Sequence, residues 1–461
     1  MTPSSTSQTD IAAWIGLDWA DQKQVISLQA ADSSQVERYR VEQKQLREWF
    51  SQLASRWPGR TVAVALEQSR GAVLYALMSF EFLRLYPINP KSLARYRESF
   101  YPSGSKGDPH DADLLREMVQ KHAERLRPWK ADTAATRRLQ LLVEYRRQSV
   151  DEQTRLTNQL TSLLKSYYPL ALECAGGLDT LQACEFLQRW PTLEALRKTT
   201  PGRLRQFYRR HGCRRDELIQ GRLEQIRQSQ PLTTDSAIVA SLSLRMRTVV
   251  AQLKALIPHI QEFDRQIVEL FAQHPDHDIF ESFPKAGPVF QPRLLAAFGS
   301  DRDRFRSARE VQQLSGVAPV TQQSGRSRWV HRRWACPKFL LQTFHEYANL
   351  SRQQPVWAAA FYQGKRAEGK KHQAAVRALA YQWIRILFRC WQDHTLYNEA
   401  HHVARCRQRQ IRGLKAALAP TQSMPELSKS SADCQSVASL LPRLIDQLLQ
   451  PNPCGKLEPQ S

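Results

Sequence analysis

The sequence predicts an α/β domain followed by two mainly α-helical domains. Two apolar, β-branched runs near the N-terminus each end in an acidic residue, as buried strands that lead into a site often do. Further along, two long stretches repeat apolar residues at three- and four-residue steps, which is typical of long amphipathic helices. Lys and Arg number 66 against 44 Asp and Glu, a net charge of +22, which favours a polyanionic partner over a small-molecule substrate.

Composition sets the broad class of the protein. The 461 residues suggest about three domains, and 42% hydrophobic with 24% charged residues is an ordinary globular balance. No apolar run reaches the ~18 residues of a membrane span, and the N-terminus lacks a signal pattern, so we expect a cytoplasmic protein without a membrane partner. The eight cysteines form no Cys-x-x-Cys pair, which is typical of reduced thiols.

The first 110 residues have the pattern of a mixed sheet with helices on it. Strands are expected at residues 12–18, 24–30, 61–67 and 85–89, the last one interrupted by prolines. Helical spacing appears at residues 41–53 and again at residues 71–83. This order of strand, hairpin, helix, strand, helix and strand predicts the α/β domain.

The middle of the chain predicts two long helices, residues 133–168 and 236–273, which would form an antiparallel hairpin or coiled coil able to dimerise. Their connector contains a segment, residues 202–215, in which six arginines are interleaved with two aromatic residues. A solvated basic loop is the alternative, but phosphate contact is the interpretation that the basic chain favours. The candidate nucleic-acid contacts are Arg209, Arg210, Arg214 and Arg215.

The C-terminal third reads as short helices with glycine turns, from residue 280 to about residue 399. Residues 284–299 resemble a helix–hairpin–helix, whose turn amides can bind a DNA phosphate. In the helices at 357–371 and 377–391 we assign the tryptophans to the core and the lysine and arginine group at 365–371 to nucleic-acid contact. From residue 417 onward the chain is rich in Ser, Pro and Gln and predicts a mobile tail with one short helix at 439–449.

Four carboxylates are the strongest chemical signal. Asp18 and Glu67 each close a predicted strand, and Asp108 and Asp111 are three residues apart, so that a helix would place them on one face. Acids that converge in this way hold one or two Mg²⁺ ions, which offset their repulsion and support phosphodiester chemistry. Helix capping by the Asp-Pro pair at residue 108 is the alternative for the last two acids. Asp113 is not a candidate, because it lies two residues after Asp111 and a helix would therefore turn its side chain away from the face of Asp111.

A serine is the second chemical candidate. Ser324 precedes a glycine in a predicted loop, with Arg326 and Arg328 close behind it. A serine that attacks a phosphodiester needs exposure, and it needs cations to stabilise the charge that develops on the phosphate. An ordinary Ser-Gly turn with no chemical role is the alternative.

Taken in order, these segments resemble the DEDD-type insertion-sequence transposases, the insertion-sequence one-ten family or bridge recombinases. The similarity spans residues 12–399. It rests on Ile-Gly-Leu-Asp-Trp-Ala at 15–20, Ala-Leu-Glu at 65–67, Lys-Gly-Asp-Pro-His-Asp-Ala at 106–112, the hairpin at 283–301, Leu-Ser-Gly-Val-Ala-Pro at 314–319 followed by Gln-Ser-Gly at 323–325, and the helix at 377–385.

The resemblance implies a RuvC-like, RNase H-type DEDD domain at residues 1–130, a helical coiled-coil region at 131–275, and a C-terminal transposase domain at 276–400, followed by a tail at 401–461. It implies that the four acids bind Mg²⁺ and that Ser324 forms a covalent phosphoserine link to DNA. A structured guide RNA would pair with donor and target double-stranded DNA. We expect a homodimer or a dimer of dimers, working at the bacterial nucleoid.

Two other function classes stay open on the sequence. A RuvC-like Holliday-junction nuclease would need the four acids and no serine nucleophile. A non-catalytic nucleic-acid-binding protein would need only the basic surface, so replacing Asp18 would then change nothing but stability.

Overall fold

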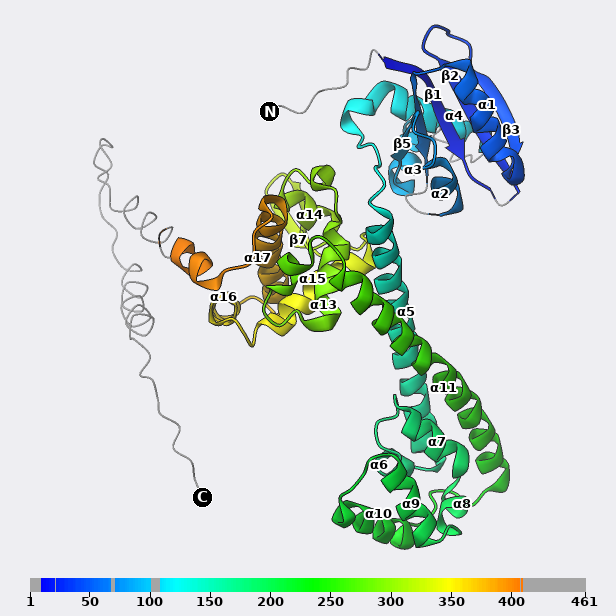
Figure 1. Ribbon diagram of the computed structural model, residues 1–461, viewed down its shortest axis with the longest axis vertical. Helices are drawn as coiled ribbons and strands as arrows, with labels where there is room; N and C mark the ends of the chain where they lie inside the picture. The colour runs from blue at the N-terminus through cyan, green and yellow to red at the C-terminus, as the bar shows by residue number, and fades with distance from the viewer. Residues whose placement is uncertain (1–9, 21, 68–70, 101–107, 407, 409–461) are drawn as a thin grey trace. The chain divides into compact units, whose positions relative to one another are not determined.

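A mixed sheet and a majority of helices make up the computed structural model, which confirms the expected mixed α/β class (Figure 1). The structure describes the chain apart from residues 1–9, 21, 68–70, 101–107, 407 and 409–461, and the side chain of Asp108 also lies outside the described part. The predicted helix at 439–449 falls in those ranges. Contacts divide the chain into residues 1–397 and 398–461. Within the described residues, no helix is long and apolar enough to cross a membrane.

The sheet combines antiparallel and parallel pairing. Its order is β3 (Glu37–Glu42), β2 (Lys23–Ala30), β1 (Ile11–Asp18), β4 (Thr61–Leu66) and β5 (Leu83–Pro87). Tight connections make β1, β2 and β3 antiparallel, whereas helical crossovers make β4 and β5 parallel to β1. The central strands β1 and β4 are buried on both faces, which explains their nearly continuous apolar sequences.

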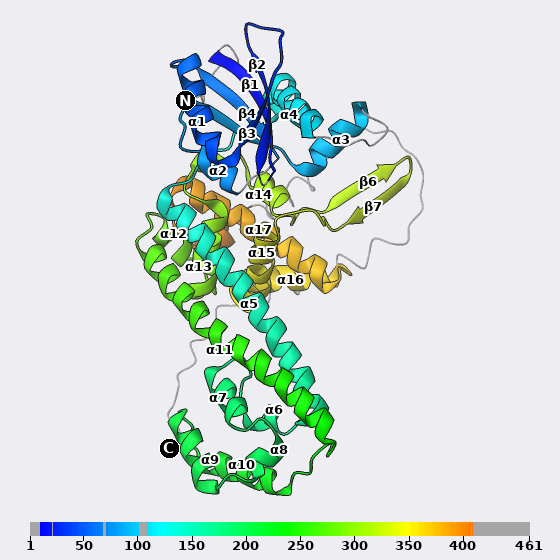
Figure 2. The ribbon, with the colours of Figure 1, turned by 90° about the vertical axis from the view of Figure 1, so that its right-hand side faces the viewer.

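Helices cover both faces of this sheet, as Figure 2 shows. On one face, α1 (Leu46–Arg56) and α2 (Ala72–Leu77) pack on Ile15, Leu17 and Val64. On the other face, α3 (Pro90–Phe100) and α4 (Asp108–His122) pack on alanines of β4. Small side chains on this second face let α4 lie close to the strands.

The predicted boundaries of two helices in this domain are wrong. Val41, expected to begin a helix, belongs to β3 and pairs with Gln24. Charged and apolar residues alternate through β3 at the period of a strand, and the free edge of β2 supplies the hydrogen bonds, so pairing prevails over helical spacing. The helix expected at residues 71–83 ends at Leu77, and strand β5 takes its last residue.

Gly16 sets the distance between α4 and strand β1. A Cβ atom built on Gly16 would lie 1.9 Å from the carbonyl oxygen of Ala112 and 2.4 Å from the backbone nitrogen of Arg116. Both atoms belong to the backbone of α4, which cannot move aside as a flexible side chain can. Glycine is therefore required for this helix to lie directly on the strand.

We expect Gly16→Ala to lower the free energy of unfolding by about 3 kcal/mol, because overpacking against backbone displaces the whole helix. Thermal and denaturant unfolding measure this change. Gly364→Ala is the matched control, since no atom lies within 4 Å of its added Cβ; a helical Gly→Ala there is expected to be neutral or stabilising by up to about 1 kcal/mol. Equal stability of the two variants would contradict the close packing of α4.

The middle of the chain is a long antiparallel helix pair, α5 (Ala134–Tyr167) and α11 (Ser236–Ala272), which matches the expected hairpin. Early residues of α5 share a core with late residues of α11, and Arg146 pairs with Asp264 between the helices. At the far end, shorter helices pack around the pair. These are α6 (Ala171–Cys174), α7 (Leu181–Arg189), α8 (Leu193–Arg197), α9 (Pro201–Arg210) and α10 (Asp216–Gln228).

The connector between the long helices is itself folded. The two aromatic residues among its arginines, Phe207 and Tyr208, are buried in the core of these short helices, so they cannot act as exposed contacts. Their spacing on α9 places them with Leu204 on one apolar face, while the arginines lie on the other.

The remaining elements form one helical core with a hairpin. They are α12 (His277–Glu281), α13 (Gly287–Phe298), α14 (Ala308–Leu314), β6 (Val320–Ser324), β7 (Ser327–His331), α15 (Lys338–Ser351), α16 (Val356–Ala367) and α17 (His372–Asp393), with 3-10 turns at Gln43–Gln45, Ala123–Arg125 and Arg302–Arg304. Trp383 and Trp391 are fully buried in this core, as expected. The α12–α13 turn has positive φ angles at Lys285 and Gly287.

Candidate functional site

The strand register brings the positions of Asp18 and Glu67 side by side. Strands β1 and β4 are parallel neighbours, with Gly16 paired to Ala65 and Leu17 to Leu66. Asp18 and Glu67 each directly follow this last pair, so their positions lie one step beyond it. Side chains alternate along a strand, so Asp18 shares the face of Gly16 and Glu67 continues the face of Ala65. Both positions therefore lie at one edge of the sheet, on the face that α4 covers.

Helix α4 runs antiparallel to β1, so its N-terminus lies at this same edge. Asp113 accepts a hydrogen bond from Ser27, which pairs with Gly16. One turn later, Arg116 reaches Gln29, which lies farther from the end of β1 that carries Asp18. Residues earlier in the helix, including Asp111, consequently lie toward the carboxyl ends of β1 and β4.

Asp111 is buried, with 1% of its surface exposed. Arg97 of α3 pairs with it at 2.7 Å from Nε and 2.5 Å from Nη2 to Oδ1. Asp111 also precedes Leu114 and Leu115 on the stripe that packs against β4. A buried carboxylate needs an opposite charge, which Arg97 supplies here. The side chain of Asp108 lies outside the described residues.

Asp113 has a structural role, as its position relative to Asp111 predicts. Ser27 Oγ lies 2.6 Å from its Oδ1, and Arg38 Nη2 lies 2.9 Å from its Oδ2. The hydrogen bond raises the pKa of the Arg38 guanidinium above its ordinary value. These bonds tie α4 to β2 and β3, away from the side of the helix that carries Asp111.

A hollow of about 380 Å³ opens at the same edge of the sheet. It is next to the acids because Val25, which pairs with Asp18, and Pro109, which follows Asp108, both line it. Lys23 and Arg40 are also in its wall. Cations beside an acidic edge can hold a phosphate near metal-bound carboxylates.

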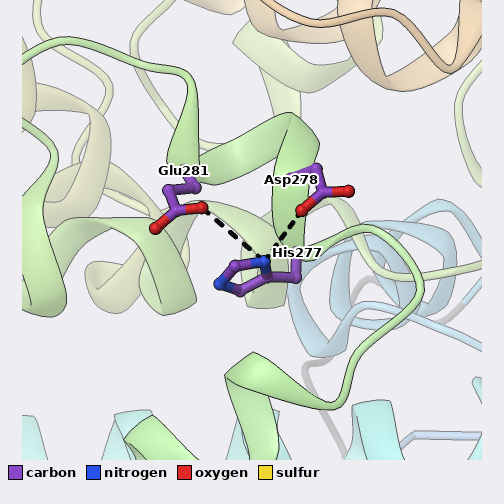
Figure 3. A group of neighbouring side chains, drawn as sticks. All are labelled: His277, Asp278 and Glu281. Atoms are coloured by element: carbon purple, nitrogen blue, oxygen red, sulfur yellow. Dashed lines mark hydrogen bonds and ion pairs between the residues drawn. The ribbon is translucent and has the colours of Figure 1, made fainter.

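Carboxylate oxygens suit Mg²⁺, so the residue types at this edge fit a divalent ion. Within the described residues, however, the ligand atoms of Asp18, Glu67 and Asp111 do not gather within 4.8 Å of one another. The described group that does is His277, Asp278 and Glu281 on α12 (Figure 3). Its histidine Nδ1 lies 3.1 Å from Asp278 Oδ1 and 3.8 Å from Glu281 Oε2, so these are contacts between near neighbours on one short helix.

Ser324 ends strand β6 in an exposed hairpin, rather than lying in a loop as expected. It pairs with Ser327 of β7 across a turn made by Gly325 and Arg326, and Gly325 has a φ of +56°. Every residue from 321 to 330 is exposed, and the hairpin stands off from the helices around it (Figure 2). This exposure and the close glycine turn are what a nucleophile for a large substrate requires.

The base of the hairpin is fixed although its tip is exposed. Gly316 packs against Cys336, whose Sγ would lie 2.4 Å from a Cβ on the glycine. Arg333 Nη1 donates to the carbonyl oxygen of Gln313 at 2.9 Å. The chain between Glu310 and Glu346 contains no carboxylate, so carboxylate ligands for a metal that activates Ser324 must come from another segment.

The predicted basic contacts lie at the surface. Arg209 and Arg210 are exposed on α9, and a hollow of about 600 Å³ is lined by Gly202, Arg205, Gln206 and both arginines. Arg209 Nη2 also lies 3.0 Å from Asp216. Arg214 and Arg215 are exposed just before α10, and Arg326 and Arg328 are exposed on the hairpin.

Two residues of the acidic edge were missed from the sequence. Arg97 of α3 pairs with Asp111 of the neighbouring helix α4. Nothing in the local sequence of Arg97 distinguishes it from other surface arginines. Gly16 had a signal, because a glycine inside a buried strand two residues before an acid often marks a close backbone approach.

Known protein families match the two segments that contain the acidic residues and Ser324. A family model of DEDD-type IS110 transposases matches residues 15–169, and a second model, described as transposase IS116/IS110/IS902 family, matches residues 277–363. The "Mini-circle putative transposase for IS117" of Streptomyces coelicolor is 30% identical over 345 residues, 73% of this chain and 83% of that protein. The IS900 42 kDa protein of Mycobacterium paratuberculosis is 28% identical over 74% of this chain and 84% of its own length. The IS110 43.6 kDa protein of S. coelicolor is 26% identical over 76% and 86%.

Proposed function

Because the chain belongs to the IS116/IS110/IS902 family of transposases, we propose that it cuts and rejoins DNA with two sets of residues, a metal-binding acidic edge and the nucleophile Ser324. The family implies DNA cleavage and strand transfer in general and suggests divalent metal use. The observation that carries the proposal is the register of β1 and β4, in which Asp18 and Glu67 directly follow the Leu17–Leu66 pair, toward the N-terminus of α4.

We assign the sheet and α4 to a RuvC-like, RNase H-type domain over residues 1–130. The antiparallel order β3-β2-β1 followed by parallel β4 and β5, with a helix across one face, supports this assignment. Asp18, Glu67, Asp108 and Asp111 would hold one or two Mg²⁺ ions there. The ion supplies charge stabilisation at a phosphate oxygen. Arg97 would then position Asp111, and Lys23 and Arg40 would hold the DNA backbone beside it.

In the proposed reaction, Ser324 Oγ attacks a DNA phosphorus while its proton passes to a base. A new O–P bond forms, the bond from phosphorus to one deoxyribose oxygen breaks, and that oxygen takes up a proton. The phosphodiester energy is kept in the protein–DNA bond, so the reverse attack by another DNA end completes strand exchange without an external energy source. Arg326, in the turn beside Ser324, would stabilise the charge on the phosphate.

The acids and the serine lie in separate segments, residues 1–130 and the proposed transposase domain at 276–400, so the reaction requires that the two meet. They could do so within one chain or between subunits of a homodimer or a dimer of dimers. Exposed apolar residues on the long helix pair, including Leu244 at 68% and Val268 at 50% exposure, offer a surface for such assembly. A protein acting on bacterial element DNA in this way would work at the nucleoid.

We propose that a structured guide RNA binds the basic face at the far end of the helix pair. Replacing Arg209, Arg210, Arg214 and Arg215 with Gln should weaken RNA binding and reduce the salt slope of log K by up to about 3.6, since each neutralised phosphate contributes about 0.7 to 0.9. Fluorescence anisotropy with RNA transcribed from the segment beside the gene, between low and moderate salt, measures both.

The matched control replaces Arg155 and Arg265 with Gln. These two arginines lie on α5 and α11 rather than on α9 or before α10, and each is paired with one or two glutamates on its own helix. The control should leave both affinity and slope unchanged. An unchanged slope in the four-residue variant would place the RNA elsewhere.

The proposal as a whole is tested with purified protein, guide RNA and DNA that carries an end of the element. Wild-type protein should form a covalent DNA adduct and recombinant product in Mg²⁺. Asp18→Asn should remove cleavage, and Ser324→Ala should remove the adduct.

A further inference from the structure

The hairpin that carries Ser324 has two different faces. Paired residues point to the same side of a two-stranded ribbon and alternate along it. Ser324 and Ser327 therefore share one face with the Gln322–Trp329 pair. Arg328 and Val330 lie on the opposite face. The serine face thus carries a large aromatic ring two residues away from the Ser324–Ser327 pair, at the next position on that face.

Folding does not explain this tryptophan. Trp329 is 60% exposed, and among the described residues its ring stacks only on His331 of the same strand, at 4.3 Å between centroids with 29° between planes. The hairpin has no buried core of its own, since residues 321–330 are all exposed. A large aromatic side chain that is exposed to solvent on a functional surface is typical of a residue that binds another molecule.

Charge identifies the chemistry of that partner. Between Glu310 and Glu346 the chain has no acidic residue, while Arg326, Arg328, Arg332 and Arg333 lie in or beside the hairpin. Arg332 also lies over the Trp334 ring at 5.2 Å, and Trp334 is 68% exposed. Arginines between exposed tryptophans fit a nucleic-acid strand, because cations bind its phosphates and aromatic rings stack on its bases.

We propose that Trp329 is a positioning residue that stacks on a nucleobase next to the phosphate attacked by Ser324. Trp329 is the diagonal cross-strand neighbour of Ser324 on this face, and such neighbours are roughly 7–8 Å apart. That distance corresponds to about two stacked nucleotides at 3.4 Å each, so the stacked base lies within one or two nucleotides of the scissile phosphate. The stack would hold the DNA strand in position over Ser324. It would require that base to unpair from its complementary base.

This inference rests on the proposed role of Ser324, and its test separates the two. DNA duplexes spanning the element end carry 2-aminopurine at single positions beside the cut. Bound with guide RNA to the Ser324→Ala protein, which leaves the DNA uncut, the probe at the stacked position should lose fluorescence. Adding Trp329→Ala should restore the fluorescence. This readout does not depend on any covalent chemistry.

Adduct formation gives the functional side of the test. Trp329→Ala should slow adduct formation roughly 10-fold or more, the effect expected from losing one base–aromatic stack. Trp329→Phe, which keeps a stacking ring, should restore the rate to within a few-fold. Val330→Ala, on the opposite face and 51% exposed, is the matched control and should behave as wild type.

Three outcomes would overturn the inference. Unchanged adduct rate and unchanged probe fluorescence in Trp329→Ala would show that no base stacks there. Loss of a dimer in Trp329→Ala without nucleic acid, measured by sedimentation, would make a second copy of the chain the partner. Failure of Phe to rescue would also contradict stacking. An adduct that persists in Ser324→Ala would instead refute the proposed nucleophile while leaving the fluorescence result interpretable.

Discussion

Asp18→Asn is expected to reduce strand cleavage by about 1,000-fold or more while leaving nucleic-acid binding intact. Asn keeps the size of the side chain but removes the negative charge that a hard cation requires. Loss of metal-assisted charge stabilisation of several kcal/mol corresponds to a loss of this size. Cleavage of supercoiled element DNA in Mg²⁺ measures it, and chelation of Mg²⁺ from wild-type protein should give the same loss.

Asp113→Asn is the matched control for this experiment. It removes a carboxylate from the same helix as Asp111, but one that bonds Ser27 and Arg38 away from the acidic edge. We expect it to lower stability modestly and to retain metal-dependent cleavage. If Asp18→Asn changes only stability, the chain would be a binding protein without catalysis. If Asp113→Asn instead abolishes cleavage, the acids have been assigned wrongly.

Ser324→Ala is expected to bind RNA and DNA normally, yet to form no covalent adduct and no recombinant product. The substitution removes one oxygen atom from an exposed position, so it should not disturb the fold. Denaturing gels separate free DNA from protein-linked DNA, and amplification across the new junction detects recombinants.

Ser327→Ala serves as the control here, because Ser327 pairs with Ser324 across the same turn and is equally exposed. It should retain both products. If Ser324→Ala still cuts DNA and leaves free 3′-hydroxyl and 5′-phosphate ends, a metal-activated water performs the cleavage. The Holliday-junction nuclease would then be the better account.

Much of the sheet was predictable because its signals are local. The runs at residues 12–18 and 61–67 are apolar and β-branched and end in acids, and they form β1 and β4 almost to the residue. The long helices α5 and α11 were equally clear, since their apolar period extends over many turns.

The elements that were wrong depend on partners distant in the sequence. Val41 forms a strand because β2 has a free edge beside it, which local spacing does not reveal. Phe207 and Tyr208 are interleaved with arginines in the sequence, but the helix places them in a core and leaves the arginines outside. A two-residue turn pairs Ser324 with Ser327, so a segment read as a loop is a hairpin.

The residues of the candidate site likewise divide into those that local sequence predicts and those that only the fold reveals. Positions 18, 67, 108 and 111 could be named from strand ends and helical spacing. The ion pair of Arg97 with Asp111 and the closeness of Gly16 to α4 arise only when the chain folds. Trp329 could have been singled out as an aromatic residue among arginines, but its place on the serine face depends on the register of the hairpin.

Peptide mapping of the trapped protein–DNA complex tests the central claim most directly. After nuclease and protease digestion, mass spectrometry should find a nucleotide attached to the peptide that contains Ser324, and fragmentation should place it on the Ser324 oxygen. A nucleotide on Ser327 or on a tyrosine, or cleaved DNA with no attached peptide, would contradict the account.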